Sequence, residues 1–341
     1  MRGRRHRSRP AGHDRRGRRP TQIYAGGARR GRVSRLRPRW WVLLIVVGAA
    51  LVAGLVARGN AKEKGARSSG EVVVVRAGRP LLRFDSQRWL GADRARRRKA
   101  LARVPRHLRR RRQASTITLR VDRRALSRRV TDAARGGGGR VPLPVRAVAA
   151  STRLPIVRQR LRNNCETAAL EMLLAGQGRR ISQSRLQGEL ARSEPVDPVG
   201  GGTSAMVWGD PDRGFVGRPD GGGPAGGYGV YERPMAALSR RHGARPTRSR
   251  GARPAAIYAE LLAGRPVMTW IGLSDGPYVR WRTREGRPVT GNFGEHTVVL
   301  TGLRGNRLAV NDPLDGRRKT WTKGKFELMW RRLGRRALSL H

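Results

Sequence analysis

Residues 154–178 read LPIVRQRLRNNCETAALEMLLAGQG. The pattern predicts a short extended segment, a loop, and then a helix that begins at or beside Cys165, because Asn163 and Asn164 are good N-cap residues. Apolar residues give this helix a buried face, and two glycines end it. A thiol at a helix N-terminus faces the positive end of the helix dipole, which lowers the thiol pKa and favours the reactive thiolate. The alternative is a buried structural cysteine, which is common for a free thiol.

The composition restricts the chemistry open to this thiol. The chain has 341 residues, with one cysteine and six histidines. A single cysteine excludes an intramolecular disulfide framework and every metal site built from several cysteines. We therefore expect no metal and no cofactor, and any cysteine chemistry falls to Cys165.

A cysteine nucleophile needs a base, and the base needs an orienting group. His296 opens the strongly β-forming run HTVVLTGL, a Gly-Asn turn follows, and RLAVNDP then forms a second strand that ends at Asp312. Such a hairpin brings Asp312 beside His296, where the carboxylate could accept the imidazole N–H and fix the tautomer. Taken singly, His296 could be a hydrogen-bonded strand-end histidine, and Asp312 could simply start a turn.

Two further side chains lie close to these residues in the sequence. Gln159 precedes Cys165 by six positions, so its amide could donate, with the backbone N–H of Cys165, to an oxyanion that develops during acyl transfer. Glu295 precedes His296 and should point to the opposite face of the strand, so we do not expect it to be the orienting group.

Together, Q-x5-C at the start of a helix, a distant G-x-H-T-V-V-L strand and a following V-N-D-P segment resemble the papain-like cysteine peptidases. The closer similarity is to the bacterial peptidase-like domains related to the bacteriocin-processing (double-glycine leader) peptidases. It covers roughly residues 154–332 and extends to WGDPDRGFVG (208–217), GYGVYERPMAAL (227–238) and LLAGRPVMTWIG (261–272).

The resemblance implies a role for each candidate residue: Cys165 is the nucleophile, His296 the general base and acid, Asp312 the orienting group and Gln159 the oxyanion donor. The sequence departs from the transporter-linked members in one place, since Glu-Thr follows the cysteine where they usually have Gly-Pro. It also contains no GxxxxGK[ST] motif, which argues against leader removal coupled to ATP-driven export.

Residues 40–57, WWVLLIVVGAALVAGLVA, contain no charge. At about 1.5 Å per residue this stretch is about 27 Å long, close to the hydrocarbon thickness of a bilayer. The 39 residues before it contain 15 Arg and one acid, so the positive-inside rule places the N-terminus in the cytoplasm and the rest of the chain outside. A buried core helix is the alternative. We predict a single-pass protein of the bacterial cell membrane, anchored through 40–57, with an extracytoplasmic C-terminal domain.

The segment that follows is strongly basic, in a chain with 75 Lys plus Arg against 23 Asp plus Glu. Its pattern predicts a hairpin over 71–84, a basic helix over 92–112 interrupted by Pro105, a strand over 115–121 and a helix over 124–135. The charge could attract anionic envelope polymers, or it could be a solvated face in an arginine-biased chain. We expect no nucleic-acid partner, because no zinc-finger, RNP-like or helix-turn-helix signature is present.

These observations predict five regions: a disordered cytoplasmic tail (1–39), a transmembrane helix (40–57), a linker (58–70), a basic extracytoplasmic region of unknown fold (71–152) and a papain-like domain (153–341). The expected fold class is α+β, with the nucleophile helix packed on an antiparallel sheet. The expected function is a cysteine peptidase-like hydrolase that cleaves a peptide or amide bond in a peptide or cell-envelope substrate. The alternative is a tethered, non-catalytic binding module of the same fold.

Overall fold

The computed structural model describes residues 70–203, 205–222 and 226–341. The predicted tail 1–39, the predicted span 40–57 and all but the last residue of the predicted linker 58–70 lie outside these ranges. Within the described ranges, no helix is long and apolar enough to cross a membrane.

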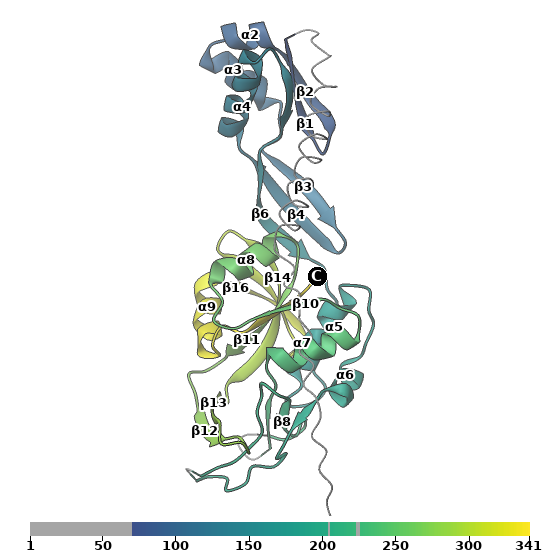
Figure 1. The fold of residues 1–341 in the computed structure, drawn as a ribbon, viewed down its shortest axis with the longest axis vertical. Helices are drawn as coiled ribbons and strands as arrows, with labels where there is room; N and C mark the ends of the chain where they lie inside the picture. Colours follow the sequence, from purple (N-terminus) through teal and green to yellow (C-terminus); the bar gives the residue numbers. More distant parts are fainter. Residues whose placement is uncertain (1–69, 204, 223–225) are drawn as a thin grey trace, which may run out of the picture. The chain divides into compact units, whose positions relative to one another are not determined.

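Residues 71–152 form an α+β region with its own apolar core (Figure 1). The predicted hairpin is confirmed, because β1 (Glu71–Arg76) pairs antiparallel with β2 (Arg79–Asp85). Strand β5 (Gly139–Pro142) adds parallel to β1. The core lies between this sheet and three helices, α2 (Ser86–Gly91), α3 (Arg94–Ala102) and α4 (Arg123–Arg135).

The predicted basic helix over 92–112 is wrong in its second half. Helix α3 ends at Ala102, and the following residues form strand β3 (His107–Arg112), which pairs with β4 (Ser115–Val121). Pro105 lacks the N–H that a continuing helix would need. Leu108 packs in the strand conformation against the apolar cluster on the neighbouring strand, so tertiary packing decides the conformation of this arginine run.

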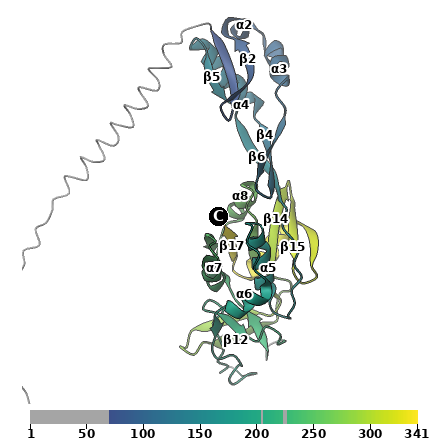
Figure 2. The same cartoon turned by 90° about the vertical axis from the view of Figure 1, so that its right-hand side faces the viewer.

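Strand β3 is the outer strand of a nine-stranded sheet with the order β10-β17-β11-β14-β6-β4-β3. Strand β15 also pairs with β14, and β16 pairs with β15. Strand β6 (Val145–Thr152) pairs with β4 on one side and with β14 (Glu295–Arg304) on the other. The basic region is therefore joined to the C-terminal region by backbone hydrogen bonds, and both views show β4 and β6 running toward β14 (Figures 1 and 2).

Helices cover both faces of the C-terminal part of the sheet. Helices α5 (Cys165–Ala175) and α7 (Glu232–Arg241) pack in one apolar cluster, and α8 (Pro254–Leu262) and α9 (Lys323–Arg332) pack in a second. Alternation along β14 separates the two clusters, since Val299 belongs to the first and Val298 to the second. The predicted α+β class is confirmed.

The remaining elements complete this region. They are α6 (Gln183–Glu189), β7 (Arg192–Ser193), β8 (Phe215–Gly217), β9 (Gly227–Gly229), β10 (Pro246–Ser249), β11 (Val267–Gly272), β12 (Tyr278–Arg282), β13 (Pro288–Asn292), β15 (Arg307–Asp312), β16 (Arg317–Thr322) and β17 (Ala337–Leu340).

Trp330 anchors α9 to the sheet and gives a test of this packing. Its side chain is fully buried, stacks on Phe326 with ring centroids 5.3 Å apart, and donates from Nε1 to the carbonyl of Arg336 at 2.7 Å. Trp330→Ala should lower the free energy of unfolding by about 3–5 kcal/mol in urea titrations, because it leaves a large cavity. Leu328→Ala, on an exposed position of the same helix, is the matched control and should change it by less than about 0.5 kcal/mol. Equal losses in the two variants would contradict the assigned packing.

Candidate active site

Helix α5 begins at Cys165, as the sequence predicts, but the asparagine before it does not cap the helix. Asn164 occupies the N-cap position without a side-chain hydrogen bond to the first turn. Its Oδ1 instead accepts from the backbone N–H of Leu161 at 2.9 Å, and its Nδ2 donates to Gln183 at 2.8 Å. Asn164 therefore fixes the approaching loop, and this places the thiol at the first residue of the helix, where only 4% of Cys165 is exposed.

The thiol lies in a buried acidic environment. Cys165 Sγ donates to Glu166 Oε2 at 3.4 Å, and the other oxygen of Glu166 accepts from the backbone N–H of Val230 at 2.7 Å. Ligand atoms of Cys165, Glu166 and Glu295 all lie within 4.8 Å of one another. Thr297 Oγ1 donates to Glu295 at 3.3 Å, so these two side chains share the face of β14 against which the sulfur lies.

The pKa of the thiol contradicts the expectation from the helix dipole. Burial raises the pKa of Cys165 well above its usual value, and the nearby charges of Glu166 and Glu295 raise it further, while the backbone N–H of Thr297 acts in the opposite direction. Desolvation and two carboxylates therefore outweigh the dipole. The resting group is a thiol that donates to a carboxyl group.

The two carboxyl groups also have raised pKa values. Burial raises the pKa of Glu166 to about 7. Burial and the charge of Glu166 raise the pKa of Glu295 well above its usual range. Two carboxylates this close in a buried site do not both ionise at neutral pH, so the pair holds at least one proton beside the sulfur.

His296 and Asp312 lie side by side, as the hairpin spacing predicts. His296 Nε2 is 2.6 Å from Asp312 Oδ1, which also accepts from the backbone N–H of Leu314 at 2.9 Å. Asp312 Oδ2 accepts from Lys319 Nζ at 2.7 Å. Burial alone would raise the pKa of Asp312, but hydrogen bonds and charge from His296 and Lys319 hold it well below its usual range. Asp312 is therefore an anion that orients the imidazole and leaves its Nδ1 for another partner.

Lys319 is a site residue that the sequence analysis missed. It lies opposite Val310 in the β15–β16 pairing, so it shares a face with Asp312, two residues further along β15. The alternation of the run RRKTWT could have identified it once β16 was recognised as a strand.

The structure does not join the thiol to the imidazole by a hydrogen bond within the described ranges; Sγ instead lies against the carboxyl group of Glu166 and the backbone N–H of Thr297. The register explains this. His296 lies opposite Ile271, whose side chain belongs to the cluster under α8 and α9, whereas α5 packs on the other face of β14. Glu295 points to the face opposite His296, as predicted, and for that reason it approaches Cys165.

Gln159 is not oriented as an oxyanion donor in this structure. Its Nε2 donates to the carbonyls of Leu161 and Arg162 at 3.0 and 2.8 Å, so both amide hydrogens are used in the loop. Its Oε1 is buried without a hydrogen-bond partner among the described residues. The amide reaches an oxyanion only after this loop rearranges.

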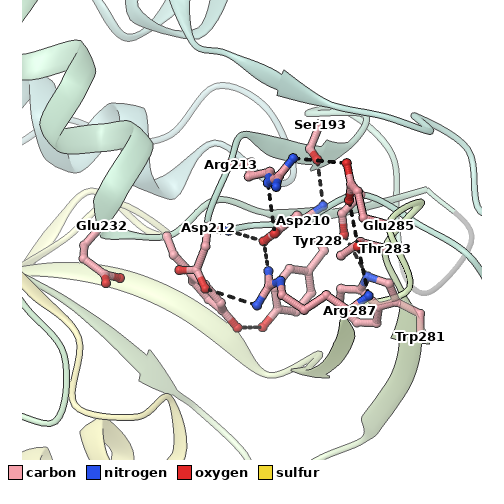
Figure 3. A network of polar contacts seen from close by, with 12 residues as sticks. Ser193, Asp210, Asp212, Arg213, Tyr228, Glu232, Trp281, Thr283, Glu285 and Arg287 are labelled. Atoms are coloured by element: carbon pink, nitrogen blue, oxygen red, sulfur yellow. Dashed lines mark hydrogen bonds and ion pairs between the residues drawn. The ribbon is translucent and has the colours of Figure 1, made fainter.

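A polar network lies beside the segment that carries Val230, and Figure 3 shows the part of it around Asp210, Asp212 and Arg287. Arg336 donates to Asp212 and Glu232 at 2.7 and 2.6 Å, and its guanidinium lies 3.7 Å from the ring centroid of Tyr231. Asp210 pairs with Arg287, which connects the loop before β8 to the hairpin of β12 and β13. These contacts fix the backbone amide that satisfies the buried carboxyl group.

Cys165, Glu166 and Glu295 form the group of three potential metal ligands in the described ranges. A thiolate and two carboxylates suit zinc in ligand type, but structural zinc sites usually contain four ligands. That the chain binds no metal stays a prediction.

Comparison with known proteins identifies the family. The model of the Peptidase_C39 like family matches residues 151–338, more than half of the chain. The chain belongs to this family. The match includes Cys165, His296 and Asp312, and it ends shortly before the C-terminus.

Similar proteins include the uncharacterised protein YvpB of Bacillus subtilis, which is 30% identical over 183 residues, 52% of this chain and 69% of YvpB. A crystal structure of a C39-like peptidase from Bacillus anthracis is 26% identical with a TM-score of 0.48, and covers 55% of this chain and 94% of that one. A double-glycine-motif protease from an AMS/PCAT transporter, solved with its leader peptide, is 15% identical with a TM-score of 0.33, and covers 56% of this chain and 92% of that one.

The acidic environment of the thiol predicts the effect of one substitution. Glu166→Gln removes a negative charge beside Sγ and should lower the thiol pKa. Alkylation by iodoacetamide at pH 7 should become about tenfold faster, because the rate follows the thiolate fraction. The measurement is the alkylation rate between pH 6 and 10.

Glu171→Gln is the matched control, since Glu171 lies on the same helix and its Oε2 accepts from the backbone N–H of Gln183. This variant should leave the alkylation profile unchanged. An unchanged or upward-shifted profile for Glu166→Gln would show that Glu166 does not raise the thiol pKa.

Proposed function

We propose that this C39-like domain is a cysteine hydrolase that cleaves a peptide or amide bond, with Cys165 as nucleophile, His296 as general base and acid, and Asp312 as the orienting group. The family match over residues 151–338 carries the proposal. It is supported by the 2.6 Å contact between His296 and Asp312 and by the position of Cys165 at the start of a buried helix.

In this reaction the thiol proton passes to His296 Nδ1, and the thiolate attacks the substrate carbonyl carbon to form a tetrahedral oxyanion. Collapse of this intermediate breaks the C–N bond, the imidazolium protonates the leaving amine, and an acyl-thioester remains on Cys165. Water, deprotonated by the same imidazole, then hydrolyses the thioester. Asp312 stabilises the imidazolium in both steps because it remains ionised.

Activation requires the thiol to exchange its hydrogen bond with Glu166 for one with the imidazole. His296 occupies the second residue of β14, at the end of the strand against which the sulfur lies. Substrate binding that displaces the loop around Gln159 would open this end of the strand and release the amide for the oxyanion.

The test is hydrolysis of a proteome-derived peptide library, analysed by mass spectrometry, with the purified full chain. Cys165→Ala and His296→Ala should each lower the rate by at least about 10³-fold, and Asp312→Asn should also lower it strongly, because these groups act as a unit. His242→Ala removes a histidine that pairs with Glu189 at 2.7 Å, far along the chain from the thiol, and is the control. Cleavage that survives Cys165→Ala would disprove the nucleophile.

The second candidate is a binding module of the same fold, and two observations favour it. The thiol donates to a carboxyl group instead of an imidazole, and both amide hydrogens of Gln159 are used by the loop. An epoxide inhibitor of cysteine peptidases distinguishes the two functions. A hydrolase reacts with it at Cys165 at neutral pH, whereas a binding module shows only slow alkylation with a raised thiol pKa.

We also propose that the domain acts outside the cytoplasmic membrane, held by residues 40–57. The uncharged sequence of this stretch and the 15 arginines before it support the proposal. An alkaline phosphatase fused to the C-terminus, a reporter active only after export, should be active in a bacterial host. Deletion of residues 40–57 should abolish that activity. If only a β-galactosidase fusion, a reporter that is active in the cytoplasm, shows activity, the C-terminal domain lies in the cytoplasm and the proposed orientation is wrong.

A further inference from the structure

We propose that the face of the sheet formed by β3, β4 and β6, together with the start of α4, binds a phosphate-bearing polymer. A cavity of about 710 Å³ lies there, lined by Arg106, His107, Arg120, Arg123, Arg124 and Arg146, with Val121 and Asp122 completing the wall. We call this set of basic residues the basic face. The proposal does not depend on the hydrolase function, because no residue of the basic face belongs to the candidate active site.

Strand register places three of these side chains in a row. His107 lies opposite Arg120 across β3 and β4, and Arg120 lies opposite Arg146 across β4 and β6. Residues in register share a face, and like charges directly opposite each other destabilise a sheet. None of the ion pairs among the described residues includes any of these three. The arrangement is therefore unfavourable for folding alone and favourable for an anion.

The single acid of the cavity does not neutralise it. Asp122 is the N-cap of α4, and its Oδ1 accepts from the backbone N–H of Ala125 at 2.9 Å. This hydrogen bond, with the nearby Arg124 and Arg128, lowers the pKa of Asp122. The carboxylate thus caps α4, and one negative charge does not neutralise the five arginines that line the cavity.

Arg123 is fixed in place at the wall of this cavity. Its Nη2 donates to the carbonyls of Ala102 and Val104, which holds the guanidinium against the end of α3. Its Nε is buried without a hydrogen-bond partner among the described residues. Because this N–H is buried, it does not face the cavity, and the part of Arg123 that lines the cavity is held in place by the two carbonyl contacts.

The chemistry of the lining selects the ligand class. The planar guanidinium matches phosphate oxygens in a bidentate manner, and several arginines together need several negative charges. The outer strand β3 extends the site. Arg109 and Arg111 are exposed, and because they follow His107 at every second residue, they lie on the same face of the strand as His107. A row of this kind fits phosphates repeated along a polymer better than a single ion.

An arginine bias of the whole chain does not explain this placement. Residues 71–152 contain 23 Lys plus Arg against 5 Asp plus Glu. In the C-terminal region, by contrast, arginines form specific ion pairs, such as Arg218 with Asp197 at 2.7 Å and Arg265 with Glu260 at 2.7 Å. The basic face combines high charge with an open cavity and no such partners among the described residues.

The experiment measures binding of inorganic polyphosphate to the full chain in detergent by fluorescence anisotropy, with poly-L-glutamate as the carboxylate comparison. The double variant Arg120→Gln, Arg146→Gln should weaken polyphosphate binding at least tenfold. It should also lower by about two the number of ions released on binding, which is read from the slope of log affinity against log salt concentration. Arg240→Gln with Arg284→Gln is the matched control, since it removes the same charge from two exposed positions outside the basic face. This control should change binding by less than twofold.

Removing repulsion between Arg120 and Arg146 should not unfold the protein, and an unchanged or higher melting temperature verifies this. Arg109→Gln with Arg111→Gln is a second pair, which should weaken long polyphosphate more than short polyphosphate. If the basic-face and control variants lose the same affinity for polyphosphate, the effect is one of net charge and the proposed site is wrong. Equal affinity for poly-L-glutamate, lost in the same variants, would overturn the phosphate class. Cys165→Ala should bind polyphosphate normally, which separates this proposal from the hydrolase.

Discussion

The buried carboxyl group of Glu166 is the constraint on which the candidate site depends. It lies between the thiol of Cys165 and the backbone amide of Val230, and burial raises its pKa from 4.5 to about 7. The folded state therefore binds a proton that the unfolded chain releases, and stability is lost as the pH rises from about 4.5 to about 7. The network around Arg336 holds the segment 228–232, and with it the backbone amide that donates to Glu166, in place.

Strand β14 divides the polar groups of the site between its two faces. Glu295 and Thr297 accompany the thiol on one face, while His296 is directed to the other and contacts Asp312, which also accepts from Lys319. Each set is held by its own hydrogen bonds, which gives a resting state with an un-ionised thiol. The raised thiol pKa thus depends on where β14 begins relative to α5, because this start brings Glu295 beside Cys165. A conformational change that brings the imidazole to the thiol has to occur at this end of the strand.

The sequence was sufficient for features set by local periodicity and spacing. The turn between two β-forming runs predicted that Asp312 lies beside His296, and the cap pattern predicted that a helix begins at Cys165. The prediction that the thiol pKa of Cys165 is lowered was wrong. The helix dipole can be inferred from the sequence, whereas burial and the approach of Glu295 are tertiary effects that the sequence does not show. The helix predicted over 92–112 failed for a similar reason, since pairing with β4 decides the conformation of HLRRRR. Nothing local indicates that the amide of Gln159 bonds to its own loop.

The same principle connects the two unusual regions of this chain. A buried acidic pair beside a thiol and a row of arginines across three strands both place like charges together, and each arrangement costs stability unless protons or counterions compensate it. At Glu166 and Glu295 the compensation is internal, because the pair retains a proton. Arg120 and Arg146 keep their charge at physiological pH and are exposed, so water and salt ions compensate them in the free protein, and the proposed polymer would replace these ions. The acidic pair can therefore be neutral in the resting protein, whereas the basic face keeps its charge and is available to the polyanion that we propose.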